Sequence, residues 1–161
     1  MSRNKYYKYH PQMKDYDLLH TVFVPFLMFT SLKNYSSKVI NTDLNGFRLS
    51  GADGKIGLNN TCKDEAINIF TGGSSAFGVG ATSDKFTISS QLSKLTTHNW
   101  LNFSGRAHVS TQEFIRFSYY RDHLTSIKNI IIFSGVNDLS PYFAATYYNK
   151  YMGTFFNASN F

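Results

Sequence analysis

The sequence predicts an α/β protein in which helices cover a parallel sheet. From residue 66 onward, short apolar runs typical of buried strands alternate with segments typical of helices. Each apolar run ends in a turn of small polar residues, which is typical of a strand leaving the sheet. The last run, Ile127 to Phe133, is β-branched and apolar on both faces, as a central parallel strand is.

These segments follow in the order strand, helix, strand, helix, strand. Ala66 to Phe70 and Trp100 to Phe103 are the first two predicted strands, and residues 84–96 form the predicted helix between them. Ser110 and Glu113 have the spacing of a capping box, so they predict the start of the second helix. The positions expected to face the core are Phe86, Ile88, Leu92 and Leu95 in the first helix and Phe114, Ile115, Phe117 and Ser118 in the second.

The part of the chain before residue 66 has a different character. It is aromatic and polar without clear periodicity, and residues 45–54 are rich in turn-forming residues, which indicates a loop or hairpin. A length of 161 residues suits one compact domain. We therefore expect an N-terminal extension over residues 1–65 and a partial α/β domain over residues 66–161.

Composition narrows the possible partners. A hydrophobic content of 42% with 16% charged residues is typical of a globular protein rather than a disordered one. A net charge of +6 is compatible with binding to RNA or an anionic membrane surface. Only Arg3 to Lys8 is densely basic, however, so no nucleic-acid partner is expected and surface binding through this stretch stays a lesser alternative.

Cysteine use and hydropathy indicate a cytoplasmic protein. The single cysteine, Cys62, excludes an internal disulfide and a cysteine-based zinc cluster, and no metal or cofactor is expected. The apolar run Leu18 to Leu32 is interrupted by His20 and Pro25 and is too short to span a bilayer. The polar segment before it does not fit a signal peptide.

The turns after the three predicted strands carry the candidate site, because the carboxyl ends of parallel strands meet at one edge of a sheet. They are Gly72 to Gly80, Ser104 to His108 and Gly135 to Asp138. In the first, Ser74 follows two glycines, which permit a sharp bend that exposes its hydroxyl. This turn lacks the lysine of a P-loop and has only an incomplete dinucleotide fingerprint.

The third turn supplies a second candidate residue. Asn137 follows the end of the last strand, and its neutral N–H donor suits an oxyanion better than a metal ion. Asp138 beside it is expected to cap a helix or turn.

Together these turns resemble the motif blocks of the SGNH/GDSL hydrolase superfamily of serine esterases. Residues 69–78 (Ile-Phe-Thr-Gly-Gly-Ser-Ser-Ala-Phe-Gly) resemble the first block, residues 101–106 the second, and Gly135-Val136-Asn137-Asp138 the third. Residues 45–48 (Asn-Gly-Phe-Arg) are similar to an element that precedes the nucleophile in some bacterial members. The resemblance covers residues 66 to 140 and implies a flavodoxin-like three-layer α/β/α fold.

The resemblance also implies a role for each residue. Ser74 would be the nucleophile, and the oxyanion would be held by its amide, the Gly105 amide and the Asn137 side chain. Gly73 stands where the family usually has Asp. The register of the second block is open, since the family's glycines can also be matched to Ser104 and Ala107.

The family takes its general base from a C-terminal Asp-x-x-His, and no histidine follows Asn137. The sequence after it, residues 142–156, predicts one more, aromatic helix. His108, in the second turn, is the candidate replacement base, with Asp17-x-x-His20 as an alternative in an exchanged arrangement. We expect a chain truncated before the base-carrying block, with an incomplete sheet whose exposed edge favours self-association.

The function expected from the sequence is that of an SGNH-type serine ester hydrolase, or of the N-terminal part of one. Its expected substrate is a small acyl ester of a sugar or metabolite. The alternative is an inactive SGNH-like remnant or ligand-binding module without a general base.

Overall fold

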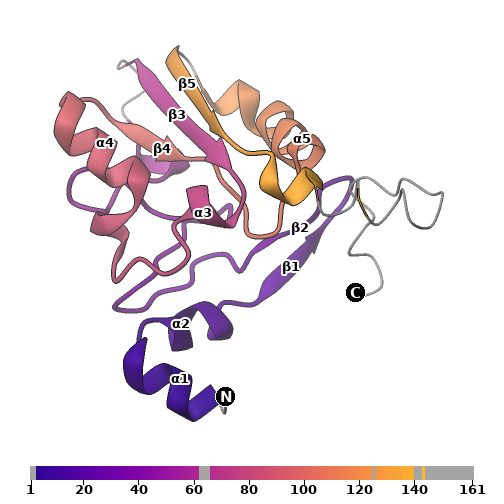
Figure 1. Ribbon diagram of the computed structural model, residues 1–161. Coiled ribbons are helices and arrows are strands. Elements are labelled where there is room, and N and C mark those ends of the chain that lie inside the picture. The colour runs from indigo at the N-terminus through magenta and orange to yellow at the C-terminus, as the bar shows by residue number, and fades with distance from the viewer. Residues whose placement is uncertain (1–2, 62–65, 125, 140–142, 144–161) are drawn as a thin grey trace.

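The computed structural model describes residues 3–61, 66–124, 126–139 and 143. A three-stranded parallel sheet is flanked by helices, and a two-stranded hairpin lies beside it (Figure 1). The predicted α/β class is therefore confirmed. The elements are α1 (Arg3–Tyr9), α2 (Met13–Leu18), β1 (Thr21–Val24), β2 (Met28–Ser31), η1 (Leu58–Asn60), β3 (Ile67–Gly72), α3 (Ser74–Phe77), η2 (Asp84–Phe86), α4 (Ile88–Thr96), β4 (Trp100–Asn102), α5 (Ser110–Tyr120), η3 (Arg121–His123) and β5 (Ile127–Phe133).

The first strand of the sheet lies in its middle. The order is β4-β3-β5, with both pairs parallel, so the chain moves outward from β3 to β4 and then returns past β3 to β5. Ile69 is paired with Leu101 on one side and Ile130 on the other. The direction of the crossover connections changes between β3 and β5, which makes this the topological switch point of the sheet.

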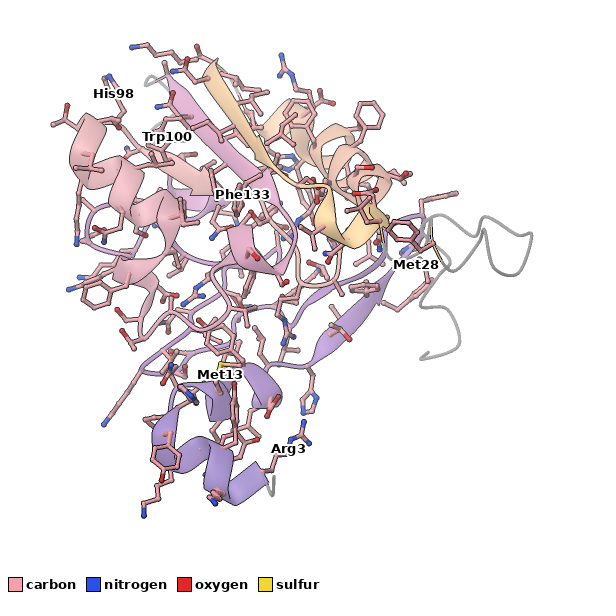
Figure 2. The ribbon with its side chains drawn as sticks, in the orientation of Figure 1. Arg3, Met13, Met28, His98, Trp100 and Phe133 are labelled. Atoms are coloured by element: carbon pink, nitrogen blue, oxygen red, sulfur yellow. The ribbon has the colours of Figure 1, made fainter. Side chains whose placement is uncertain are left out.

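Helix α4 begins later than predicted and buries a different face. Residues 84–86 form the separate turn η2, and Thr87 caps α4 by accepting a hydrogen bond from the Ser90 amide. The buried side chains of α4 are serines rather than the expected apolar residues, and Ser93 accepts a hydrogen bond from the Trp100 amide at 3.0 Å. Small serines let the helix approach β4 and Trp100 closely (Figure 2). Phe86, Ile88 and Leu95 are exposed, and Leu92 alone of the four is half-buried.

The buried face of α5 is also polar. Phe114 and Ser118 are exposed, whereas Gln112, Glu113 and Arg116 are buried. The Arg116 guanidinium donates to the carbonyl oxygens of Ser104 and Gly46, and burial lowers its pKa to about 10. Loops that pass under the helix present carbonyl groups, and buried carbonyl groups need donors. Of the four positions expected to face the core, Phe117 packs against the main apolar cluster and Ile115 is half-buried, so that prediction is confirmed in part and the carbonyl groups explain the polar side chains beside them.

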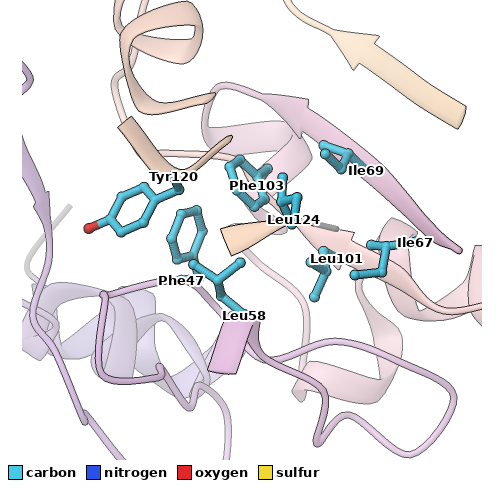
Figure 3. Close-up of a cluster of buried hydrophobic side chains, with 8 residues drawn as sticks. All are labelled: Phe47, Leu58, Ile67, Ile69, Leu101, Phe103, Tyr120 and Leu124. Carbon is cyan, nitrogen blue, oxygen red and sulfur yellow. The ribbon is translucent and has the colours of Figure 1, made fainter. Parts of the chain in front are cut away.

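The N-terminal residues share the core of the sheet. The largest buried cluster joins Phe47 and Leu58 to side chains of β3, β4 and the end of α5 (Figure 3). A second cluster joins Tyr16, Leu19, Val39 and Ile40 to Phe77 of α3. The segment predicted as an extension therefore packs against the α/β part at two places.

Arg48 is the most heavily bonded of these N-terminal side chains. Its Nε donates to Asp84 Oδ1 at 2.8 Å, and both side chains are buried. Its Nη1 donates to the Tyr16 hydroxyl and the Gly78 carbonyl oxygen, each at 2.8 Å, and its Nη2 donates to the Val39 carbonyl oxygen at 2.9 Å. One guanidinium thus joins α2, the loop before β3, η2 and the end of α3.

Strand β5 forms an edge of the sheet. Ile127 is half-buried and the side chains after it are exposed, with 71% of the Ile132 surface accessible. The expectation of a central, fully buried strand is wrong for the part of the chain that the structure describes. The self-association predicted from such an edge stays a prediction.

The apolar run Leu18 to Leu32 forms the β1–β2 hairpin, with β2 largely buried and β1 more exposed. None of the helices in the described part of the chain is long and apolar enough to cross a membrane. Cys62 and the predicted helix over 142–156, apart from position 143, lie outside the described residues.

Replacing Arg48 tests the importance of its buried ion pair. Arg48→Met leaves the Asp84 carboxylate buried without its cation, so the free energy of unfolding should fall by about 3–5 kcal/mol. The control is Arg3→Met, because Arg3 pairs with Asp17 at the surface with a side chain that is 77% exposed. That change should cost less than about 1 kcal/mol. Urea denaturation measures both, and equal small losses would contradict the assignment.

Candidate functional site

A cleft of about 120 Å³ opens at the carboxyl ends of β3 and β5, at the switch point of the sheet. Ligand crevices of open α/β sheets lie at such positions. Phe133, at the carboxyl end of β5, lies at this edge of the sheet (Figure 2). The lining residues come from the turn after β3 (Gly73, Ser74 and Ser75) and from the end of β5 and the turn after it (Phe133, Ser134, Gly135, Val136 and Asn137).

Close contacts account for the two glycines before Ser74, most strictly for Gly72, which faces main-chain atoms of β5. A Cβ atom at Gly72 would lie 2.1 Å from the Phe133 carbonyl oxygen, and one at Gly73 would lie 2.5 Å from Asn137 Nδ2. Both distances are far shorter than van der Waals contact. The glycines therefore let the end of β3 pass directly against β5 and the turn after it. A side chain at Gly73 would have to displace the carboxamide of Asn137.

Ser74 is the first residue of α3 and is half-buried at the cleft. The short helix ends at Gly78, whose left-handed backbone (φ 89°) is readily adopted by glycine. The Phe77 and Gly78 carbonyl oxygens both accept hydrogen bonds from Arg48. The turn that carries Ser74 is thus fixed at its start by glycine contacts and at its end by a buried guanidinium.

Asn137 lies beside the turn that carries Ser74. Its Nδ2 donates to the His108 carbonyl oxygen at 2.7 Å. A carboxamide nitrogen carries two N–H groups, so this bond orients the side chain and leaves a second donor. The structure therefore brings Ser74 and Asn137 to one cleft.

Gly105 does not have the position expected of an oxyanion donor. Its amide donates to the Gly72 carbonyl oxygen at 3.0 Å, so this N–H is already used between the two turns. A Cβ at Gly105 would lie 2.1 Å from Nδ1 of His108. Ala107, in contrast, is exposed and has a left-handed backbone (φ 58°), a conformation that favours glycine. Ala107, and not Gly105, is therefore the position in this turn whose backbone conformation favours glycine.

His108 is a packing residue rather than a base at the cleft. Its ring is 1% exposed, and its Nε2 lies 3.0 Å from the Phe29 carbonyl oxygen. Burial, with a smaller contribution from the Arg116 charge, lowers the pKa of His108 from 6.5 to about 3. The carbonyl group of His108, not its ring, contacts Asn137.

The alternative pair, Asp17 and His20, is not assembled as a catalytic dyad. The Asp17 carboxylate accepts a hydrogen bond from the Tyr7 hydroxyl and pairs with Arg3. Among the described residues, those that line the cleft provide hydroxyl, carboxamide and apolar side chains and no titratable base.

Near the cleft, Asp138 caps a helix as expected, whereas Glu113 has a partner that the sequence did not predict. The Asp138 carboxylate accepts hydrogen bonds from the amide and hydroxyl of Ser110, so it caps α5 from another element. Glu113 does not complete a capping box. It accepts a hydrogen bond from the hydroxyl of Ser134 at 2.7 Å, and the Gln112 side chain takes the capping position by accepting from the Val109 amide. Burial raises the pKa of Glu113, and the nearby charge of Asp138 raises it further.

Comparison with known proteins adds no assignment. The chain matches no protein-family model and no curated protein. In the described part of the chain, no three His, Cys, Asp or Glu side chains are grouped as a metal site would need.

Exchanging glycine and alanine in the second turn tests the different constraints on positions 105 and 107. Gly105→Ala should lower the free energy of unfolding by several kcal/mol, about 2 or more, because the new methyl group displaces the buried His108 ring. Ala107→Gly should leave it unchanged or raise it by up to about 1 kcal/mol, because glycine removes left-handed strain. Thermal and urea denaturation measure both variants. A larger loss for Ala107→Gly than for Gly105→Ala would contradict these constraints.

The buried neutral imidazole of His108 predicts a loss of stability in acid. Its pKa is lower in the folded state than in the unfolded state, so the unfolded state takes up the proton first. The free energy of unfolding should therefore fall as the pH drops below about 6.5, by about 2 kcal/mol at about pH 5. His108→Gln should be less stable at neutral pH but should lose that much less on acidification. Parallel curves for the two proteins would contradict the assignment.

Proposed function

We propose that the cleft is the nucleophile and oxyanion half of an SGNH-type serine ester hydrolase site for small acyl esters of a sugar or metabolite. The observation that carries this proposal is the convergence of Ser74 and Asn137. They come from turns more than sixty residues apart and line one cleft at the switch point of a parallel sheet.

The strand order supports the same proposal. In the flavodoxin-like order 2-1-3-4-5, the first strand lies between the second and third, and the ligand binds between the first and third. The order β4-β3-β5 corresponds to the first three strands of that arrangement, with the cleft at the matching position. We infer a flavodoxin-like three-layer fold, of which this chain supplies at least these three strands.

The proposed chemistry is acyl transfer to a serine hydroxyl. Ser74 Oγ attacks the ester carbonyl carbon, and negative charge develops on the carbonyl oxygen. The second N–H of Asn137 and the Ser74 amide donate to that oxygen, and the Ala107 amide takes the role first expected of Gly105. Each such donor, pre-oriented by the fold, typically contributes a factor of about 100 to the rate.

The proton of Ser74 needs an acceptor that the described residues do not place at the cleft. A second candidate function, a ligand-binding module without turnover, is favoured by this same observation. Both readings keep Ser74 and Asn137 at the ligand and differ only in whether a base reaches Ser74.

Chemical rescue separates these functions. If a base reaches Ser74, a fluorophosphonate probe should label it without any additive, whereas labelling that requires added imidazole indicates a cleft without its own base. Ser74→Ala should abolish labelling, Ser75→Ala should preserve it, and Asn137→Ala should slow it about 100-fold. Labelled peptides are identified by mass spectrometry.

The control variants show which results would rule out each function. A correctly folded protein that stays unlabelled at saturating imidazole, or one labelled equally after Ser74→Ala, would rule out the esterase. Saturable ligand binding without labelling would support the binding module.

A further inference from the structure

The hydroxyl of Ser134 is a polar group at the cleft that the proposed chemistry does not use. Ser134 is the residue between β5 and Gly135, and it lines the cleft together with Ser74 and Asn137. Its Oγ donates to Glu113 Oε1 at 2.7 Å. Ser134 is exposed, so a molecule bound in the cleft can reach its side chain.

The hydrogen-bond partner of Ser134, Glu113, is a buried acidic residue. It lies in the first turn of α5, and only 6% of its surface is exposed. Burying a carboxylate costs free energy, and a neutral acceptor would be sufficient to tie α5 to the end of β5. The carboxylate does something that a neutral amide does not, because an ionised carboxylate only accepts hydrogen bonds.

This partner fixes the direction of the Ser134 hydrogen bond. With its proton directed to Glu113, the Ser134 oxygen offers only lone pairs to a neighbouring group. A molecule in the cleft must therefore approach Ser134 with a donor. The carboxylates of Glu113 and Asp138 also make this side of the cleft unfavourable for a phosphate or carboxylate group.

We propose that Ser134, oriented by Glu113, binds a hydroxyl donor on the alcohol part of the substrate and so selects uncharged polyol esters over simple alkyl esters. This inference rests on the proposed esterase function. It assigns the acyl carbonyl to Ser74 and Asn137 and the alcohol part to the β5 side of the cleft.

Three acetate esters of nearly equal size test the proposal at mildly alkaline pH with imidazole present. The three esters differ in their alcohol parts. That of ethylene glycol monoacetate can donate a hydrogen bond from its free hydroxyl, that of ethylene glycol methyl ether acetate can only accept one, and the alkyl chain of propyl acetate can do neither. For the wild-type protein, kcat/KM should be roughly three- to ten-fold higher for the monoacetate than for the other two.

Two variants locate the effect. Ser134→Ala should remove the preference for the monoacetate, so that its kcat/KM falls to about that of propyl acetate measured on the same variant. Glu113→Gln, which is isosteric, should raise kcat/KM for the ether relative to propyl acetate, because a carboxamide can donate to Ser134 Oγ and release its proton toward the ligand. Circular dichroism confirms that each variant is folded.

The outcomes distinguish this inference from the function beneath it. Turnover of all three esters with equal kcat/KM, or a preference that survives Ser134→Ala, overturns the role of Ser134 and leaves the esterase intact. No Ser74-dependent turnover of any ester overturns the esterase and this inference together.

Discussion

The buried guanidinium of Arg48 is the interaction on which the rest of the structure depends. It is fully enclosed and joins parts of the chain that make no continuous secondary structure with one another. Asp84 balances its charge, while carbonyl oxygens of Val39 and Gly78 use its remaining N–H groups. A buried charge is stable only when it is paired and hydrogen-bonded in this way. The N-terminal segment is therefore held on the α/β part by a contact that also fixes the end of the turn that carries Ser74.

Close packing of main chain against main chain shapes the cleft itself. The end of β3 passes so near to the main chain of β5 that Gly72 has no room for a Cβ atom, and a Cβ atom at Gly73 would have to displace the Asn137 carboxamide. The Gly105 amide then bonds the second turn to the first, and Asn137 bonds the third turn to the second. All three turns are linked by hydrogen bonds between backbone or carboxamide groups. Such a site is pre-oriented before any ligand binds, which is what stabilisation of a developing charge requires.

Charged and titratable side chains near the cleft serve mainly to hold its walls. His108 packs its neutral ring between the hairpin and Gly105, and Asp138 caps α5. Among the described side chains at the cleft, Asn137 and Ser134 each have their hydrogen-bonding direction fixed by a neighbouring acceptor. The walls thus present a carboxamide donor and an oriented hydroxyl group, and the described residues that line the cleft include no titratable base.

The sequence by itself determined the three strands of the parallel sheet, their order along the chain and the turns that carry Ser74 and Asn137, because apolar runs and glycine-rich turns are local properties. It did not predict the β1–β2 hairpin or the edge position of β5. Tertiary structure alone decided which helical faces are buried, since a helix packs serines or arginine inward when its neighbours offer close backbone and carbonyl groups. It also decided that the Gly105 amide is used between turns and that the His108 ring is buried. Those outcomes depend on contacts between segments far apart in the chain, which residue type and spacing along the sequence do not predict.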